Sequence, residues 1–347
     1  MWATKVALEA DYSVIAVARD LDPSLEHDVR HVPLHVPPAV FSYQWARALG
    51  TVRSALAGVE YDLLHSFQAQ LTGVADTWHV CFLTRSAQQA RSFSRDRDLR
   101  SRWRRSQSRL VALMEDRYLG RVTESVDVLF PSALMLREFS RLYGEPPRHQ
   151  MLANPAERLI DLSGEERLSA RLDLVGTFDG VVVGYLGGMD ERKGWRELVA
   201  GVAGTPEAFL LFGGSGSEGF SDPRLSERCR SVGFVTDLTS FLAACDVLAV
   251  PSRFDPWAQV VTDAAARGVP SITTPMVGVQ EEVLRYSAGV SWDGRADSFP
   301  AVLRTVAERH DDLVAGARCL AAVLDEQQVS QSLRRIWMEA LVFKGHL

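Results

Sequence analysis

The sequence predicts an α/β protein with two domains, each built on a parallel sheet. The chain has 347 residues, and two domains are the natural expectation at this length. The C-terminal half alternates short apolar runs with amphipathic helical segments, which is the pattern of a parallel sheet covered by helices on both faces. Hydrophobic residues make up 46% of the chain and charged residues 24%, ordinary values for a globular protein.

The elements of the C-terminal half can be assigned in chain order. Runs rich in β-branched residues, bounded by glycine or proline, predict strands, and segments with a helical spacing of apolar residues predict helices. Strands are expected at 180–186, 208–214, 231–235, 246–252, 270–274 and 288–292. Helices are expected at 194–204, 237–245, 257–267 and 279–284.

The N-terminal half shows a weaker version of the same pattern. Strands are expected at 12–18, 61–67, 79–84 and 126–132, and a helix at 133–144. We therefore assign an N-terminal domain to residues 1–157 and a C-terminal domain to residues 158–327, with the hinge near 154–160. The apolar helix expected over 328–347 must dock on another part of the chain, and we expect it to pack on the N-terminal domain.

Composition and charge limit the classes of partner. The net charge of −6 argues against nucleic acid as the main partner. The four cysteines are scattered without a C-x-x-C pair, which favours a reduced, cytoplasmic protein. No apolar run reaches the length of a membrane span. An arginine-rich stretch at 94–109 is either a solvated helix or a weak contact with an anionic membrane surface.

The segment 254–270 holds two carboxylates, Asp255 and Asp263, around an expected helix start. One interpretation is structural: Asp255 caps the helix, and Asp263 pairs with Arg267 four residues later. The other is functional, because ligands of open parallel sheets bind beyond the carboxyl ends of the strands, where this segment lies.

Five stretches of the C-terminal half, in order, resemble those of the GT-B fold glycosyltransferases of family 4, which are retaining enzymes that use nucleotide-sugar donors. These stretches are 185–204, 209–216, 232–252, 254–274 and 275–283. Weaker matches occur at 61–67, 121–144 and 151–155. The resemblance implies two Rossmann-like domains facing each other across a cleft.

The resemblance also implies roles for individual residues. Lys193, with Arg192 beside it, would neutralise the leaving diphosphate, and Asp255 would contact the transferred hexose. Asp263 would hold the ribose hydroxyls. The remaining residues expected at the donor site are Gly187, Gly188, Gly213, Gly214, Trp257, Ala258, Gln259 and Glu281. No metal and no cofactor are expected, since the nucleotide-diphosphate sugar is a co-substrate.

The chain departs from the family pattern at several positions. Both family glutamates are aspartates here, and the family glycine after the aromatic is Ala258. The family histidine that orients the sugar has only Arg85 and Ser86 as candidates. The family's first strand and glycine-rich loop have no counterpart, so we expect the N-terminal domain to lack its first strand.

The leading hypothesis is a cytoplasmic, metal-independent retaining hexosyltransferase. Its acceptor would be a glycan, a lipid-linked compound or a secondary metabolite. The alternative is a non-catalytic glycosyltransferase-like partner subunit or a truncated pseudoenzyme. A third possibility is an isomerase or phosphorylase on the same fold.

Overall fold

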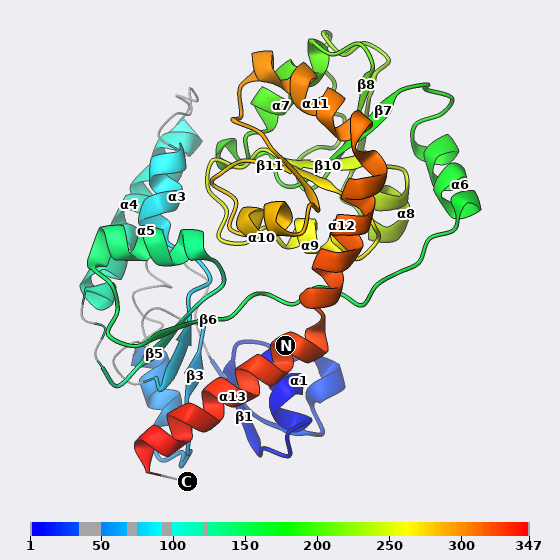
Figure 1. Cartoon of the computed structure of the whole chain (residues 1–347). Helices are drawn as coiled ribbons and strands as arrows, with labels where there is room; N and C mark the ends of the chain where they lie inside the picture. The colour runs from blue at the N-terminus through cyan, green and yellow to red at the C-terminus, as the bar shows by residue number, and fades with distance from the viewer. Residues whose placement is uncertain are drawn as a thin grey trace.

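The computed structural model describes residues 2–34, 50–67, 75–91, 99–120, 122 and 124–345. It has two lobes (Figure 1). The chain passes between the lobes twice, once after β6 and once between α12 and α13. Each lobe contains a sheet of parallel strands, as the sequence predicts. The architecture is the two-domain α/β arrangement that the sequence predicts.

The C-terminal lobe holds a six-stranded sheet in the order β12-β11-β10-β7-β8-β9. The strands are β7 (Val181–Leu186), β8 (Ala208–Gly213), β9 (Cys229–Gly233), β10 (Val247–Val250), β11 (Ser271–Thr273) and β12 (Gly289–Ser291). Every neighbouring pair is parallel. The strand order reverses between β7 and β10, and such a switch point opens a crevice at the carboxyl ends of the two strands.

Helices cover both faces of this sheet. They are α6 (Gly164–Leu174), α7 (Trp195–Ala203), α8 (Leu238–Ala243), α9 (Gln259–Ala265), α10 (Gln280–Arg285), α11 (Phe299–Glu308) and α12 (His310–Val323). Successive residues of β8 point to opposite faces, so Phe209 joins the core under α8 and α9, while Leu210 joins the core under α7 and α11. Asp237 caps α8, because its carboxylate accepts from the backbone N–H of Ser240 (3.0 Å).

The N-terminal lobe holds a four-stranded parallel sheet and a separate parallel pair. The sheet contains β3 (His65–Ser66), β4 (Thr77–His79), β5 (Asp127–Phe130) and β6 (His149–Met151), and the pair is β1 (Val14–Ala18) with β2 (Val29–Pro33). The helices are α1 (Trp2–Leu8), α3 (Thr84–Arg91), α4 (Leu99–Leu119) and α5 (Ala133–Tyr143). Short 3-10 helices are η1 (Pro23–Leu25) here and η3 (Glu191–Lys193) and η4 (Ala296–Ser298) in the other lobe.

The strand expected at 79–84 is misplaced, because β4 ends at His79. Val80 and Leu83 are fully buried, but their backbone has already left the sheet. A short apolar run indicates burial, and it does not by itself distinguish a strand from a buried loop.

The C-terminal helix α13 (Glu326–Lys344) leaves the C-terminal lobe and crosses the N-terminal lobe (Figure 1). Leu333, Ile336 and Trp337 of this helix pack with Val6 of α1 and Leu129 of β5 in one apolar cluster. The first and last described helices of the chain therefore share a core. At the start of α13, Ala156 and Asp325 bridge the two crossing segments.

Candidate donor site between the two lobes

The loop after β7 is shaped by a cap and a glycine. Asp190 accepts a hydrogen bond from the backbone of Arg192 (2.8 Å) and so starts η3. Gly194 ends η3 at a φ of +67°, and a Cβ there would overlap the carbonyl oxygen of Pro251 after β10. Only glycine satisfies both the positive φ and the close approach. The loop therefore presents Arg192 and Lys193 at the switch point of the sheet.

Asp255 meets this loop from the other side of the switch point. Its backbone is fixed by hydrogen bonds with Met276 (2.9 Å) and Gly278 (2.8 Å), and its side chain is only 9% exposed. The Lys193 ammonium lies 2.6 Å from the Asp255 carboxylate. Arg192 lies 3.9 Å from the same carboxylate and donates to the carbonyl oxygen of Phe254 (2.5 Å). The three residues that we expect to carry the chemistry are in one cluster.

The structural interpretation, in which Asp255 caps the helix, is wrong. Helix α9 begins at Gln259, and Ala258 precedes it in the left-handed region with a φ of +69°. Asp255 forms a parallel β-bridge with Val277 instead. From the backbone after it, its carboxylate accepts a hydrogen bond from the N–H of Trp257 (3.4 Å). A left-handed alanine costs about 1–2 kcal/mol. A glycine at position 258 would adopt the same positive φ without this strain.

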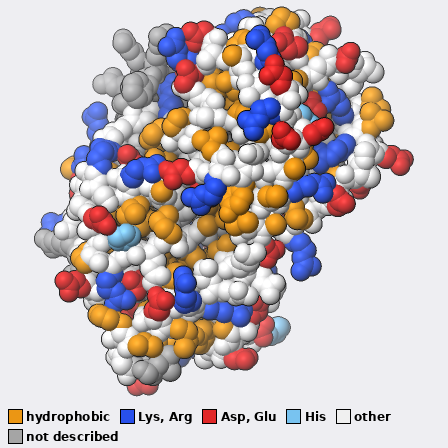
Figure 2. Space-filling view, in the orientation of Figure 1, with side chains coloured by type: hydrophobic (Ala, Val, Ile, Leu, Met, Phe, Trp, Pro, Cys, Tyr) orange, Lys and Arg blue, Asp and Glu red, His pale blue; other side chains and the backbone are white. Residues whose placement is uncertain are grey.

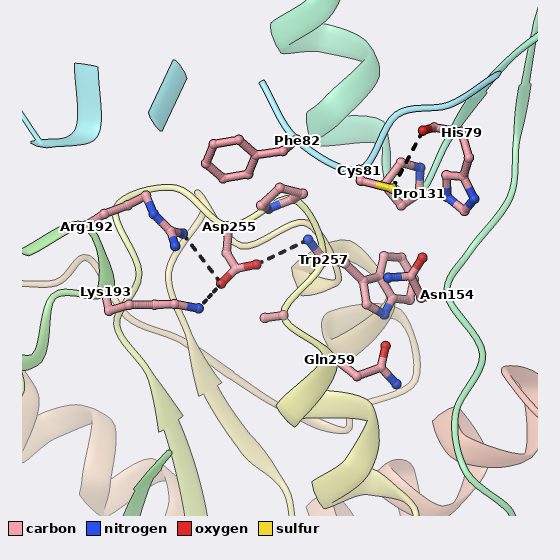
Figure 3. Close-up of a pocket in the computed structure, with 12 residues that line it drawn as sticks. His79, Cys81, Phe82, Pro131, Asn154, Arg192, Lys193, Asp255, Trp257 and Gln259 are labelled. Carbon is pink, nitrogen blue, oxygen red and sulfur yellow. Dashed lines mark hydrogen bonds and ion pairs between the residues drawn. The ribbon is translucent and has the colours of Figure 1, made fainter. Parts of the chain in front are cut away.

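A cavity of about 290 Å³ lies at this cluster, between the two lobes (Figure 3). Six of the residues expected at the site line it, namely Arg192, Lys193, Asp255, Trp257, Ala258 and Gln259. The N-terminal lobe contributes the opposite wall with His79, Cys81, Phe82 and Pro131. Burial raises the pKa of the Cys81 thiol to about 11, so this cysteine is a neutral thiol near pH 7.

The expected glycines lie next to the cavity, at the ends of β7 and β8. Gly187 donates to the carbonyl oxygen of Gly213 (3.0 Å). A Cβ on Gly214, which has a φ of +126°, would overlap the backbone of Gly187. Around Gly188 the nearest atom to an added Cβ would be 3.9 Å away, so this position is open. The two glycine loops therefore approach each other closely, and none of the four glycines lines the cavity itself.

Asp263 and Glu281 also lie outside the cavity lining. Asp263 does not pair with the Arg267 guanidinium, which is buried and lies 2.9 Å from the Glu157 carboxylate. Arg267 contacts Asp263 through its backbone, because the guanidinium donates to the carbonyl oxygen of Asp263 (2.9 Å). Burial raises the pKa of Asp263 to about 6, and Gln259 donates to its carboxylate (3.4 Å). The surface ion pair that the helical spacing suggested is therefore not formed.

Glu281 faces the other lobe. Its carboxylate lies 2.5 Å from the Arg137 guanidinium of α5. Nearby, the Ser132 hydroxyl donates to the carbonyl oxygen of Pro256 (2.8 Å). These contacts join the start of α5 to the loops around the candidate site.

Sequence reasoning missed His79 and chose the wrong candidates on the N-terminal lobe. Arg85 is paired with Asp116, and the Ser86 hydroxyl donates to Glu138 (2.7 Å), so neither lines the cavity. His79 and Asn154 line it instead. The signal for His79 was its place at the end of a strand, and the strand had been assigned too far along the chain.

The described residues hold no candidate metal site and no candidate membrane-spanning helix. No three His, Cys, Asp or Glu side chains among them are grouped so that they could hold a metal ion. Within the same part of the chain, no helix is long and apolar enough to cross a membrane.

Residues 180–308 match the family model of the glycosyl transferases group 1. The C-terminal domain belongs to this family. The group 1 domain includes the Lys193 loop, Asp255 and the whole switch point of the sheet.

Curated relatives agree with this assignment. The lipopolysaccharide core biosynthesis glycosyltransferase LpsE of Rhizobium meliloti is 27% identical over an alignment of length 201 that covers 49% of this chain and 59% of LpsE. A D-inositol 3-phosphate glycosyltransferase of Geodermatophilus obscurus is 26% identical over 61% of this chain and 52% of that protein. The chain thus spans just over half the length of these two relatives.

Solved structures share the fold across nearly the whole chain. Sucrose-phosphate synthase of Thermosynechococcus elongatus aligns with a TM-score of 0.75 at 18% identity, covering 98% of this chain and 92% of that one. HepE of Anabaena, solved with UDP and glucose, aligns with a TM-score of 0.67 at 16% identity, covering 97% of this chain and 95% of that one.

Proposed function

We propose that this protein is a retaining glycosyltransferase that moves a hexosyl group from a nucleotide-diphosphate sugar to an acceptor. The observation that carries the proposal is the Lys193–Asp255 pair, 2.6 Å apart at the switch point of a group 1 domain and open to a cavity between two lobes. A partly buried cation next to a cavity suits a diphosphate. HepE, of the same fold, was solved with UDP-glucose.

The chain's own residues suggest a division of work. Lys193 and Arg192 would balance the charge that develops on the leaving diphosphate, and they would do so without a metal ion or a cofactor. Asp255, whose side chain is 9% exposed, would orient the hexose while its charge remains balanced by Lys193. Helix α9 has only seven residues and starts at Gln259, so we assign its dipole a minor role.

The first experiment measures binding of UDP, GDP and ADP to the full chain by calorimetry, with UMP as the monophosphate control. We expect one diphosphate to bind, and Lys193→Gln to weaken it about 10- to 150-fold, the effect of one hydrogen bond between charged groups. Arg196→Gln is the matched control, because Arg196 lies in the first turn of α7, directly after the loop, and pairs with Glu191. Lys193→Arg keeps the positive charge, so its binding distinguishes a loss of charge in Lys193→Gln from a folding defect. Absence of binding by all three diphosphates would contradict the proposal.

The stereochemistry is tested with the donor sugar that binds. Slow hydrolysis of an α-linked donor followed by proton NMR should first release the α-anomer if the enzyme retains configuration. Early release of the β-anomer would contradict retention.

The alternative is a non-catalytic nucleotide-binding subunit. It is favoured by the fact that Arg85 and Ser86 are both engaged inside the N-terminal lobe and do not face the cavity. Diphosphate binding without any turnover of donor sugars would support it.

We also propose a weak contact with an anionic membrane surface through α4. Three large apolar residues of this helix are exposed, with exposed fractions of 53% for Trp103, 47% for Leu110 and 63% for Leu113. Leu110 and Leu113 follow Trp103 by seven and ten residues, so the three side chains lie on one face of the helix. Arg109 and Arg117 are exposed beside them. Apolar side chains next to arginines are typical of helices that lie in a membrane interface. Elsewhere, as Figure 2 shows, basic and acidic side chains are interspersed over the visible face.

A further inference from the structure

Two cations line the cavity at the candidate site, and their partners differ. The Lys193 ammonium is paired with the Asp255 carboxylate at 2.6 Å. The Arg192 guanidinium lies 3.9 Å from the same carboxylate, which is beyond hydrogen-bond distance, and its side chain is 13% exposed. Among the described residues that line the cavity, Asp255 is the one carboxylate. The charge of Arg192 is therefore the one that remains available to an anionic ligand.

The guanidinium of Arg192 also has unused hydrogen-bond donors. A guanidinium carries five N–H bonds in one plane. Among the described residues, that of Arg192 donates to the carbonyl oxygen of Phe254 (2.5 Å), and its buried Nε has no hydrogen-bond partner. An unmade hydrogen bond on a buried charged group is unfavourable, so an attraction of another kind is needed to hold this side chain where it lies.

An aromatic ring of the other lobe supplies this attraction. Phe82 lies between β4 and α3, and the centroid of its ring is 5.6 Å from the guanidinium carbon of Arg192, within the range of a cation–π interaction (Figure 3). The same ring makes an edge contact with the ring of Phe254, with 6.2 Å between the two centroids. Arg192 is therefore held by the carbonyl oxygen of Phe254 and by a ring that packs on Phe254.

Core packing does not explain the place of Phe82. Val80 and Leu83, close to it in the sequence, are fully buried, whereas Phe82 is 38% exposed and lines the cavity. A ring also differs from a carboxylate as a partner for a cation, because it attracts the charge without neutralising it and leaves the N–H donors free. Phe82 thus keeps Arg192 in place and leaves it able to bind an anion.

We propose that Phe82 is a positioning residue of this site, which holds the Arg192 guanidinium in place for the diphosphate group of the ligand. Arg192 belongs to the loop after β7, so a ring of the N-terminal lobe sets the position of a cation of the C-terminal lobe. The proposal rests on the proposed function, because the cations of the cavity are taken to bind a diphosphate. The effect of Phe82 on binding is expected to pass entirely through Arg192.

The first arm follows the side chain of Arg192 without a ligand, by NMR of the full chain with isotope-labelled arginine. Arg192→Lys identifies the Nε–H signal of Arg192 by its loss. In Phe82→Leu, which keeps apolar bulk and removes the π face, this signal should shift, because the ring current that acts on it disappears. In Phe82→Tyr the signal should stay close to its wild-type position, since the ring remains.

The second arm measures the binding of inorganic pyrophosphate, UDP, GDP and ADP to the same variants by calorimetry. For the probes that bind, Phe82→Leu should weaken the affinity about 3- to 10-fold, the effect of a cation–π contact in a partly desolvated site. Phe82→Tyr should bind them as wild type does. Phe82→Leu combined with Arg192→Gln should bind no more weakly than Arg192→Gln alone, because a positioning residue has no effect once the residue that it positions is gone.

Phe343→Leu is the matched control for both arms. Phe343 of α13 also makes a cation–π contact, with 3.9 Å between the centroid of its ring and the guanidinium carbon of Arg148. Neither of these two residues lines the cavity. This variant should therefore leave the Arg192 signal and the binding of every probe unchanged.

The outcomes separate this proposal from the proposed function. Failure of UDP, GDP and ADP to bind contradicts the glycosyltransferase, while the Arg192 signal and pyrophosphate still test Phe82. The role of Phe82 is overturned if Phe82→Leu leaves the Arg192 signal in place or binds the probes as tightly as wild type. It is also overturned if Phe82→Tyr loses as much affinity as Phe82→Leu, if the losses of Phe82→Leu and Arg192→Gln add in the double variant, or if wild type binds none of the four probes.

Discussion

At the scale of single residues, Asp263 gives the clearest pH dependence. Its pKa is raised by burial and by Glu157 to about 6, from an ordinary value of 3.8. The folded state therefore holds the proton more tightly than the unfolded state. The stabilisation from this proton is fully present below about pH 4 and is lost as the pH rises through about 6.

We therefore expect Asp263→Asn to remove a loss of stability that the wild type shows between pH 4 and pH 7. Urea unfolding at several pH values measures it. Asp237→Asn is the matched control with the opposite sign, since hydrogen bonds from Ser240 lower the pKa of Asp237 and its stabilisation is lost on acidification. A stability difference between wild type and Asp263→Asn that does not change with pH would contradict the expectation.

The charged residues of the site could be predicted from the sequence, whereas the neutral ones could not. Lys193 precedes a glycine and Asp255 precedes a proline, both in loops after apolar strands, so residue type and position indicated the site together. His79 lies inside an apolar stretch, where a histidine looks like a core residue. Its role at the cavity depends on where β4 ends, and element boundaries are the least certain part of a sequence prediction.

At the scale of elements, the strands that the sequence predicts poorly are those whose formation depends on pairing with distant segments. Strands β7 and β8 are six residues each and carry apolar residues that face two cores, so their sequence is unambiguous. Strand β3 has two residues, and it forms only because β4 pairs with it. Such a strand has almost no local sequence signal.

The exposed apolar side chains of helix α4 should carry the proposed membrane contact. Trp103→Ser and Leu113→Ser should each reduce binding of the full chain to phosphatidylglycerol vesicles at least about fivefold, because burying a large apolar side chain contributes about 1.5–3 kcal/mol. Sedimentation of the vesicles measures the bound fraction. Phe234→Ser is the control, since Phe234 is 70% exposed but lies on the other lobe. Equal losses for all three variants, or no binding by the wild type, would exclude a role for this face.

At the scale of the whole molecule, the loop after β10 joins the two lobes. Phe254 belongs to this loop, yet it is fully buried in the apolar cluster of the N-terminal lobe with Phe130 and Phe139. Its carbonyl oxygen accepts from Arg192, and the next residue is Asp255. The position of the candidate catalytic carboxylate therefore depends on how the N-terminal lobe sits against this loop, which no local sequence pattern reveals.

The Arg137–Glu281 ion pair is the polar part of the same junction, and it tests the expected donor role of Glu281. Both side chains are about half-exposed, at 58% and 42%, so the pair should contribute little to stability. We expect Arg137→Gln and Glu281→Gln to lower the unfolding midpoint slightly and equally, and the double variant to add no further loss. UDP affinity should change less than twofold in either variant, because Glu281 does not line the cavity. Calorimetry and thermal unfolding of the four proteins measure both effects. A tenfold loss of UDP affinity in Glu281→Gln, with Arg137→Gln unaffected, would return Glu281 to the donor site and leave Arg137 as a partner that the donor displaces.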